Sequence, residues 1–256
     1  MDPTLRTAYA ACRRMQRRHD PTYFAATRLL PASVRPAIHA VYGFVRTADQ
    51  IVDGPDRPAT PEQRRAALDA WERELELARS GRAAHPVPTA LVDAGARHHL
   101  PLDELHTYMS SMRLDCAPVR IRNDAELDRY MNGSAAAVGR IMAPLIGTPE
   151  RPEEVARLGM AFQLANFVRD VREDWALDRV YLPGLPERDL EIGQAGDGFR
   201  EHVARQVDRA RAMFRETRGV DAEVSGRVRH GMYLARSVYG RVLDRVERAD
   251  YDVLAA

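Results

Sequence analysis

Cysteine is scarce in this sequence and lysine is absent. Only Cys12 and Cys116 occur in 256 residues, too few for a disulfide framework or a thiolate metal site. We therefore expect a reducing, cytoplasmic compartment. All 38 basic residues are arginine, and the codon bias of a GC-rich genome explains this better than a need for bidentate phosphate contacts.

The sequence also lacks an excess of one charge and any hydrophobic run of membrane-spanning length. Its 38 basic and 37 acidic residues leave a net charge of +1, which argues against partners chosen by bulk charge, such as nucleic acids. The longest weakly polar stretch, residues 134–147, is interrupted by Arg140 and is shorter than the roughly 20 residues of a membrane span. No apolar core of a signal peptide follows the N-terminal arginines. A soluble protein is expected, with peripheral membrane contact through apolar patches left open.

Alternating strand patterns are scarce, whereas helical spacing recurs along most of the chain. Thr60 with Gln63, and Asn123 with Glu126, have the spacing of N-caps and their capping-box partners. The predicted helices cover residues 4–18, 22–29, 33–53, 61–79, 87–97, 102–112, 124–147, 152–177, 197–217 and 222–249.

The loops between these helices show no linker composition. Residues 181–198 form the longest loop, which serves either as a lid or as a plain surface connection. No internal repeat or low-complexity tract is present. The sequence predicts an all-α fold in which residues 1–256 form a single domain.

Two predicted helices each carry a polar stripe that ends in a pair of aspartates. The first stripe consists of Tyr42, Arg46, Asp49 and Asp53, and the second of Gln163, Asn166, Asp170 and Asp174. In each stripe the spacing keeps all four side chains on one side of the helix. One such pair alone is best explained as a solvated face with i,i+4 charge pairs. Two self-repelling pairs, each followed closely by a loop, favour sites for cations instead.

Carboxylate oxygens without histidine or thiolate ligands favour Mg²⁺, which is readily completed by water and phosphate oxygens. A helical cavity with these pairs on opposite walls would hold a diphosphate, and neutralising that leaving group allows a carbon–oxygen bond to ionise. An allylic prenyl diphosphate is the common substrate that leaves a stabilised cation. The runs 134–139 and 141–146 would supply an apolar tunnel for its tail, or would simply pack neighbouring helices.

Longer segments around both stripes resemble the squalene/phytoene synthase family, most closely the phytoene synthases of actinobacterial type. The matching segments are 19–31, 42–53, 112–115, 130–147, 163–174, 178–183 and 238–244. They follow one another along nearly the whole chain, which makes the resemblance specific. It implies an isoprenoid-synthase bundle around a central cavity and a diphosphate-releasing prenyltransferase that acts in isoprenoid biosynthesis.

The resemblance also implies roles for individual residues. Mg²⁺ would be held by Asp49, Asp53, Asp170 and Asp174. Diphosphate would be contacted by Arg46, Gln163, Asn166, Arg169 and Tyr239. The mouth of the cavity would be lined by His19, Thr22 and Tyr23, and the reacting carbons would be faced by Tyr42 and Tyr130. The competing interpretations are a surface histidine for His19 and core tyrosines for Tyr130 and Tyr239.

Several positions depart from the family pattern. Gln50 stands where a third acid is common, Pro21 where a basic residue is common, and Asn132 replaces an aromatic residue. The region 183–239 is shorter than usual, and the sequence ends at residues 250–256 where relatives typically continue into a basic segment. Fewer cationic contacts weaken the case for seating a second prenyl diphosphate.

These departures favour a Mg²⁺-dependent enzyme that transfers one prenyl group, expected to be farnesyl, to a small acceptor such as the indole of a tryptophan-containing cyclic dipeptide. The alternative is head-to-head condensation of two prenyl diphosphates, as in phytoene or squalene synthesis. A non-catalytic helical assembly protein is a minor alternative. Donor length (C15 or C20), the acceptor, the final product and the oligomeric state are left open by the sequence.

Overall fold

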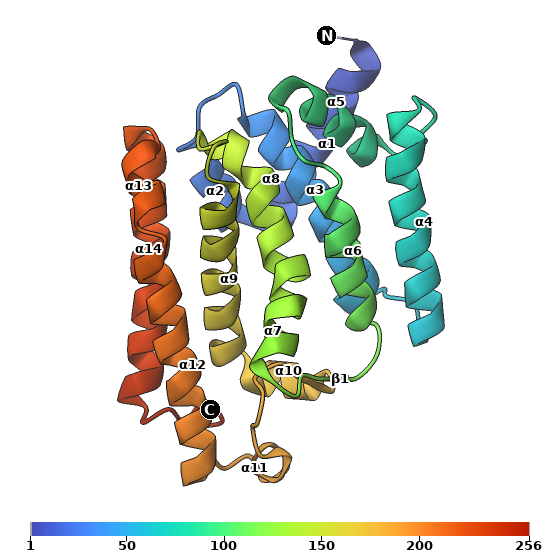
Figure 1. Cartoon of the computed structure of the whole chain (residues 1–256). Coiled ribbons are helices and arrows are strands. Elements are labelled where there is room, and N and C mark those ends of the chain that lie inside the picture. Colours follow the sequence, from blue (N-terminus) through green and yellow to red (C-terminus); the bar gives the residue numbers. More distant parts are fainter. Residues whose placement is uncertain (1, 256) are drawn as a thin grey trace.

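The computed structural model describes residues 2–255, which form an elongated bundle of helices (Figure 1). The helices are α1 (Pro3–His19), α2 (Pro21–Thr27), α3 (Arg35–Asp53), α4 (Pro61–Arg79), α5 (Pro86–His98), α6 (Glu104–Leu114), α7 (Asp124–Met131), α8 (Ala137–Ile146), α9 (Pro152–Arg169), α10 (Val171–Ala176), α11 (Glu187–Ile192), α12 (Asp197–Glu216), α13 (Gly219–Glu223) and α14 (Gly226–Arg248). Two short strands, β1 (Val119–Arg120) and β2 (Arg179–Val180), pair in parallel. The all-α class predicted from the sequence is confirmed.

The predicted helix starts at residues 60 and 123 are confirmed by their caps. Gln63 N donates to Thr60 Oγ1 and Thr60 N donates to Gln63 Oε1, both at 3.2 Å, which is a complete capping box. Asn123 accepts from Glu126 N at 2.9 Å, but the Glu126 carboxylate accepts from the preceding amide, Arg122 N, at 2.9 Å. The second box is therefore shifted by one residue, while the helix still begins at the predicted place.

Two of the helices predicted as continuous are interrupted. A π-helical turn, Asn132–Ala136, separates α7 from α8. α6 lies so close to this turn that a Cβ on Gly133 would be 1.9 Å from Ser111 Oγ. The predicted helix 152–177 breaks at Asp170, whose φ of −100° and ψ of 17° end α9 before α10 begins. This break turns the end of the second polar stripe away from the α9 axis.

The C-terminal helix predicted over residues 222–249 is also divided. Val224 has extended backbone angles, φ −76° and ψ 153°, and separates α13 from α14. The loop predicted over 181–198 contains the short helix α11 and buries Leu182, Leu185 and Leu190. Because these side chains are packed into the bundle, the loop is a structured connection and not an open lid.

The apolar core has two main parts. One part includes Phe44 and Tyr108 on α3 and α6, and the other includes Phe167 and Phe199 on α9 and α12. The small residues of α8 allow α9 to approach closely, since a Cβ on Gly139 would lie 2.7 Å from Ala156 Cα. In this fold, Gly139 of the run 134–139 therefore serves helix packing.

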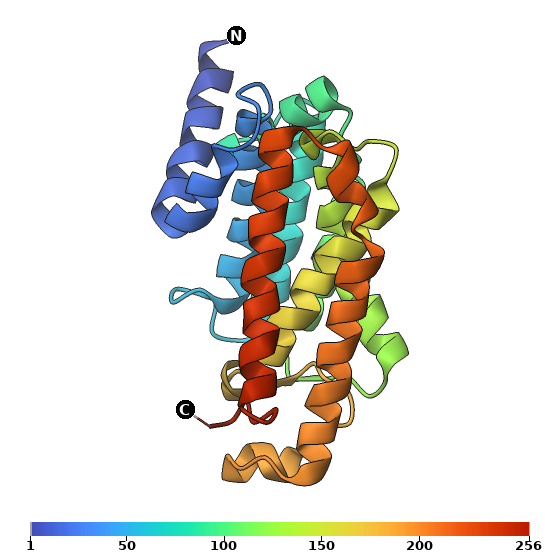
Figure 2. The same ribbon diagram turned by 90° about the vertical axis from the view of Figure 1, so that its left-hand side faces the viewer.

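The helices α1 and α2 form a hook that is fixed to α3 by buried polar contacts. Gln16 Nε2 donates to Thr27 Oγ1 at 3.1 Å, and the Gln16 amide oxygen contacts His39 Nδ1. Asp20 starts α2 by accepting from Tyr23 N at 2.8 Å. The N-terminal part of α1 projects beyond the bundle, and α14 runs along the face that is turned to the viewer in Figure 2. None of the helices within residues 2–255 combines the length and apolar character of a membrane span.

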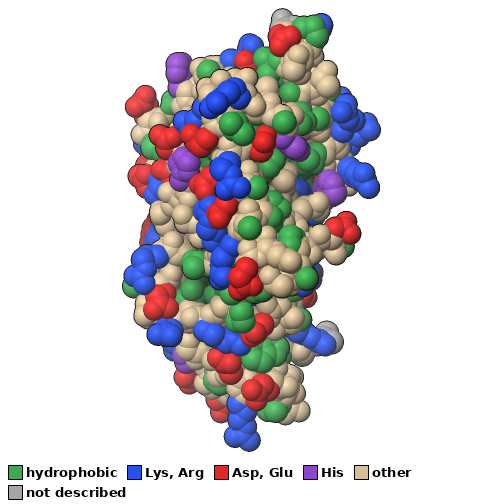
Figure 3. All heavy atoms as spheres, turned by 90° about the vertical axis from the view of Figure 1, so that its right-hand side faces the viewer, with side chains coloured by type: hydrophobic (Ala, Val, Ile, Leu, Met, Phe, Trp, Pro, Cys, Tyr) green, Lys and Arg blue, Asp and Glu red, His purple; other side chains and the backbone are tan. Residues whose placement is uncertain are grey.

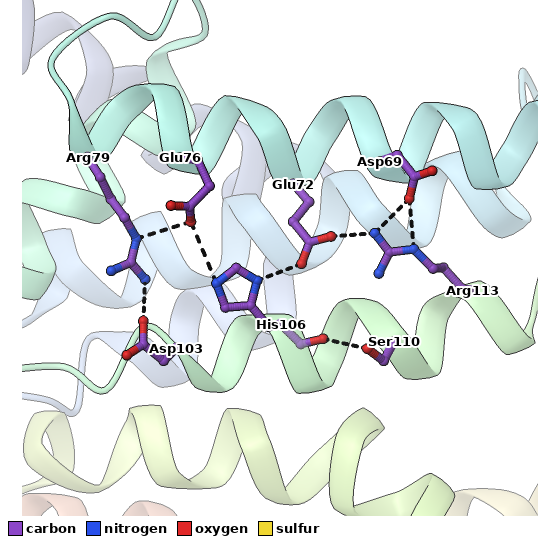
Figure 4. Close-up of polar contacts among 8 residues, drawn as sticks. All are labelled: Asp69, Glu72, Glu76, Arg79, Asp103, His106, Ser110 and Arg113. Carbon is purple, nitrogen blue, oxygen red and sulfur yellow. Dashed lines mark hydrogen bonds and ion pairs between the residues drawn. The ribbon is translucent and has the colours of Figure 1, made fainter.

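The outer side of α4 and α6 carries mixed charge (Figure 3), and a close-up shows a ladder of paired side chains there (Figure 4). The charged members of this ladder are Asp69, Glu72, Glu76, Arg79, Asp103, His106 and Arg113. Arg113 contacts both Asp69 and Glu72, and Arg79 donates to Asp103 at 2.8 Å. His106 Nδ1 lies 2.7 Å from Glu72 Oε1. Every carboxylate in the ladder has a cationic or imidazole partner.

Candidate active site

A cavity of about 360 Å³ lies between α3, α6, α9 and the paired strands. Its polar lining residues are Asp49, Asp53, Tyr108, Asp115, Tyr130, Ser134, Gln163, Asn166, Asp170, Asp174, Arg179 and Tyr181. The two aspartate pairs predicted from helical spacing thus reach one cavity from α3 on one wall and from α9 and α10 on the other. Tyr130, Gln163 and Asn166 also line it, as expected.

The two aspartates on α3 have different partners. Arg179 holds Asp53 with two hydrogen bonds, at 2.9 and 2.5 Å. Asp49 accepts from the Tyr108 hydroxyl at 3.0 Å, and among residues 2–255 no cation lies within ion-pair distance of it. Burial raises the pKa of Asp49 to about 6. One carboxylate of this pair is therefore neutralised by the protein and the other is not.

The second pair is divided in the same way. Arg169 donates to both carboxylate oxygens of Asp170, at 2.5 and 2.6 Å. Asp174 has no such partner within the part of the chain that the structure describes. Burial, and after it the negative charge of Asp170, raises the pKa of Asp174 to about 7. Asp49 and Asp174 are thus carboxylates on facing walls that an added cation would stabilise.

The floor of the cavity is a polar network of which the sequence interpretation named only Tyr130 as a site residue. Asp115 accepts from the Tyr130 hydroxyl at 2.5 Å and from the Tyr181 hydroxyl at 2.8 Å. Its main-chain oxygen accepts from Arg179 at 2.8 Å, so Arg179 joins this floor to Asp53. Burial raises the pKa of Asp115 to about 6.

A signal for part of this floor is present in the sequence. Tyr108 and Met112 on α6 and its C-cap Asp115 are spaced i, i+4 and i+7, a spacing like that of the aspartate stripes. Arg179 lies on the short strand β2 and Tyr181 directly follows it, so helical spacing gives no signal for them, although both fall in the segment 178–183 that resembles the family. Only the pairing of β1 with β2 places them at the cavity.

Several buried polar atoms in the lining of the cavity, or on α3 beside it, have no hydrogen-bond partner within residues 2–255. They are Arg46 Nε, Ser134 Oγ, Asn166 Oδ1 and Arg179 Nε. Such atoms are uncommon in folded proteins and are usually satisfied by a ligand or water. The Arg46 and Arg179 donors suit an anion, whereas Asn166 Oδ1 with the carboxylates of Asp49 and Asp174 supplies hard oxygen ligands.

These oxygens fit Mg²⁺, although the protein alone does not complete its coordination shell. Within residues 2–255 no three histidine, cysteine or acidic side chains come close enough together to hold an ion. Mg²⁺ commonly keeps several waters and is bound by one or two carboxylates together with substrate phosphates. An incomplete protein shell is therefore what a site for a metal–diphosphate complex requires.

The remaining predicted residues lie outside the lining of the cavity; they are His19, Thr22, Tyr23, Tyr42, Arg46, Arg169 and Tyr239. The rings of Tyr23 and Tyr42 are 6.0 Å apart, and Tyr239 packs against Phe162 with the ring centroids 4.7 Å apart. Desolvation, and then the charges of Arg46 and Arg18, lowers the pKa of His19. The region predicted as the mouth is therefore aromatic and positively charged.

Comparison with known sequences identifies relatives along the whole chain. The model of the squalene/phytoene synthase family matches residues 16–256. The phytoene synthase of Thermus thermophilus is 34% identical, over 99% of this chain and 88% of its own. The 15-cis-phytoene synthase of Synechococcus elongatus is 33% identical, over 98% of this chain and 87% of its own.

Solved structures show the same architecture. The squalene synthase HpnC from Alicyclobacillus acidocaldarius superposes with a TM-score of 0.89 at 30% identity, over 98% of this chain and 97% of that one. A dehydrosqualene synthase solved with a ligand gives a TM-score of 0.84 at 23% identity, over 97% of this chain and 89% of that one. At that identity the second match supports the fold alone.

Proposed function

Because this chain belongs to the squalene/phytoene synthase family, we propose that it joins two prenyl diphosphates head to head and releases diphosphate. It is a prenyltransferase of the squalene/phytoene synthase type. The observation that carries the proposal is the charge arrangement of the cavity. Each wall presents one carboxylate held by arginine and one that is free to bind a cation.

Transfer to an indole acceptor, the main function expected from the sequence, has no support from the relatives. That expectation rested on the short C-terminal region. The chain nevertheless covers 97% of a protein named squalene synthase, so its length does not distinguish it from head-to-head enzymes. The comparisons favour the alternative, in which both substrates are prenyl diphosphates.

We propose that Asp49, Asp53, Asp170 and Asp174 hold Mg²⁺, with Asn166 Oδ1 as a further oxygen ligand. The metal, when bound, would neutralise the departing diphosphate so that the carbon–oxygen bond can ionise. Arg179 and Arg169 orient Asp53 and Asp170 before substrate arrives. The unpartnered Nε of Arg46 and the amide of Gln163 would position the diphosphate.

An aromatic group at the floor suits the cation that ionisation leaves. Phe167 and Tyr181 stack with centroids 4.3 Å apart, and Tyr130 lies 5.0 Å from Tyr181. Burial, and then the charge of Asp115, raises the pKa of Tyr130 well above its usual range. Its hydroxyl therefore stays neutral and donates to Asp115, while the ring faces stabilise positive charge and exclude water. We assign Tyr130 to the reacting carbons on this basis.

The residues predicted to line the mouth of the cavity support the proposal by their positions. His19, Thr22 and Tyr23 lie on the hook formed by α1 and α2, next to Tyr42 and Arg46 of α3. Arg169 is the last residue of α9, and Tyr239 of α14 packs against Phe162 of the same helix. We propose that these side chains admit and hold a diphosphate at the entrance.

Both cysteines of the chain are buried free thiols, which supports the reducing cytoplasmic compartment inferred from their scarcity.

The proposal is tested by incubating the purified protein and Mg²⁺ with labelled farnesyl or geranylgeranyl diphosphate, with and without a tryptophan-containing cyclic dipeptide. A hydrocarbon of two prenyl units, or its cyclopropyl diphosphate, is expected from one substrate alone. Product mass shows which donor length is used. Diphosphate release that depends on the dipeptide and gives only a prenylated indole would contradict the proposal.

A further inference from the structure

The surface formed by α1, α2 and the start of α3, called here the arginine face, carries arginine almost without acid. Its arginines are Arg6, Arg13, Arg14, Arg17, Arg18, Arg28 and Arg35. Residues 3–35 contain these seven arginines and one acid, Asp20, a net charge of +6 in a chain whose total is +1. The near-neutral composition therefore hides a strong local asymmetry of charge.

The arginine face is not neutralised by the rest of the described chain. Every arginine that forms an ion pair within residues 2–255 is Arg79 or a later one. Asp93 on the adjacent helix α5 is already engaged by Arg97 at 2.6 Å and by Tyr9 at 2.7 Å. Arg35 donates to the main-chain oxygens of Leu30 and Arg28, both at 2.9 Å. The other guanidinium groups of the face are available to an external anion.

The arginines border three adjoining hollows. One, of about 370 Å³, lies between Arg13, Arg28 and Arg35. A second, of about 270 Å³, shares Arg13 and includes Arg14 and Arg17, and a third continues past Arg17 to Arg18. Guanidinium groups bind phosphate oxygens in a bidentate manner. Hollows bordered by several of them suit phosphate groups spread over a surface.

Exposed apolar side chains adjoin this charge. On α14, Tyr233, Leu234 and Val238 are 73%, 60% and 50% exposed. Leu29, at the end of the hook, reaches α14, since its Cδ1 would lie 3.2 Å from a Cβ on Gly231. The hook stands at the edge of the face along which α14 runs (Figure 2). Large exposed apolar side chains beside unpaired arginines are typical of surfaces that enter a lipid headgroup layer.

We propose that the arginine face and the adjoining part of α14 bind the surface of an anionic phospholipid bilayer. The arginines bind lipid phosphates, and Leu29, Tyr233 and Leu234 enter the headgroup region. An acidic protein would match the charge but gives no role to the exposed apolar side chains. The proposal does not rest on the reaction assigned above: none of these arginines or apolar side chains lines the cavity, and His19 of the predicted mouth lies at the edge of the third hollow.

The test is sedimentation of the full chain with vesicles of phosphatidylcholine alone or containing about 30% phosphatidylglycerol. Binding is expected only with the anionic lipid and should weaken as salt is added. Each arginine at an anionic surface changes the partition coefficient about fivefold. The triple variant Arg14→Gln, Arg17→Gln, Arg18→Gln should therefore bind about a hundredfold more weakly.

A matched control removes the same charge from the opposite end of the bundle: Arg129→Gln, Arg188→Gln, Arg205→Gln, all exposed and without ion pairs in the described chain. It should keep nearly all of the binding, with circular dichroism used to show that both triple variants are folded. Leu234→Ser tests the apolar contact without touching the core, and should weaken vesicle binding about fivefold while binding to polyglutamate stays unchanged.

Three results would overturn the proposal. The first is a wild-type protein that does not bind the anionic vesicles. The second is an equal loss of binding in the two triple variants, which would show that net charge matters and the arginine face does not. The third is binding to polyglutamate without binding to vesicles, which would identify an acidic macromolecule as the partner.

Discussion

The ladder between α4 and α6 and the cavity between α3 and α9 both concentrate carboxylates, yet the protein treats them differently. In the ladder, burial opposes ionisation of Glu72, but hydrogen bonds from Arg113 and His106 outweigh it and lower the pKa of Glu72. In the cavity, the unpaired carboxylate of Asp174 has its pKa raised by burial to about 7. The difference teaches that a candidate ligand-binding carboxylate is identified by the lack of a cationic partner, and not by a high local density of acidic residues.

The largest expected effect would come from removing an unpaired cavity carboxylate. Asp174→Asn should lower kcat for diphosphate release by a factor of about 100 to 1,000, because stabilisation of the leaving group is lost. Asp69→Asn, in the ladder, should change kcat by less than about twofold. Steady-state assays of the two variants provide the check, and comparable losses in both would remove the distinction between the two regions.

The arginines of the two regions should differ in their effect on stability. Arg179 is buried and joins Asp53 to the floor of the cavity, so Arg179→Gln should lower the free energy of unfolding by about 3 kcal/mol. Arg79 is more exposed, and Arg79→Gln should cost less than about 1 kcal/mol. Urea denaturation measures both values. Equal costs would show that Arg179 is not structurally coupled to the cavity.

The pH dependence of the free energy of unfolding measures how much the buried, unpaired carboxylate of Asp174 destabilises the fold. The pKa of Asp174 is raised on folding, so the folded state keeps a proton that the unfolded state releases, and stability falls as pH rises from about 4 to 7. Asp174→Asn removes the contribution of Asp174 to this pH dependence and leaves those of Asp49 and Asp115. Without Mg²⁺, raising the pH from 4 to 8 should destabilise wild type relative to the variant by roughly 4 kcal/mol, as measured by denaturation. A constant difference would show that Asp174 is not buried.

The smallest effect is expected in the ladder itself. His106 is half exposed and contacts Glu72 and Glu76 on neighbouring turns of α4. His106→Gln should lower the free energy of unfolding by less than about 1 kcal/mol and leave kcat unchanged. A loss of activity would mean that the ladder communicates with the cavity.

The parts of this structure that the sequence predicts are those set by local spacing. The capping box of Thr60 and Gln63 depends on residues three apart, and the stripe from Tyr42 to Asp53 depends on the period of one helix. The partners of those stripes depend on the whole fold. Asp53 and Arg179 are 126 positions apart, and the break at Asp170 leaves no signal in helical periodicity.

The central claim is that Asp49 and Asp174, the cavity carboxylates without cationic partners in the described chain, bind Mg²⁺. Its direct test is titration calorimetry of Mg²⁺ into protein that is saturated with inorganic diphosphate. Wild-type protein and the ladder variant Asp69→Asn, Glu76→Gln should release the same heat. The cavity variant Asp49→Asn, Asp174→Asn should show no Mg²⁺ binding, because it lacks the two carboxylates without cationic partners. Retained binding in the cavity variant, or its loss in the ladder variant, would contradict the assignment.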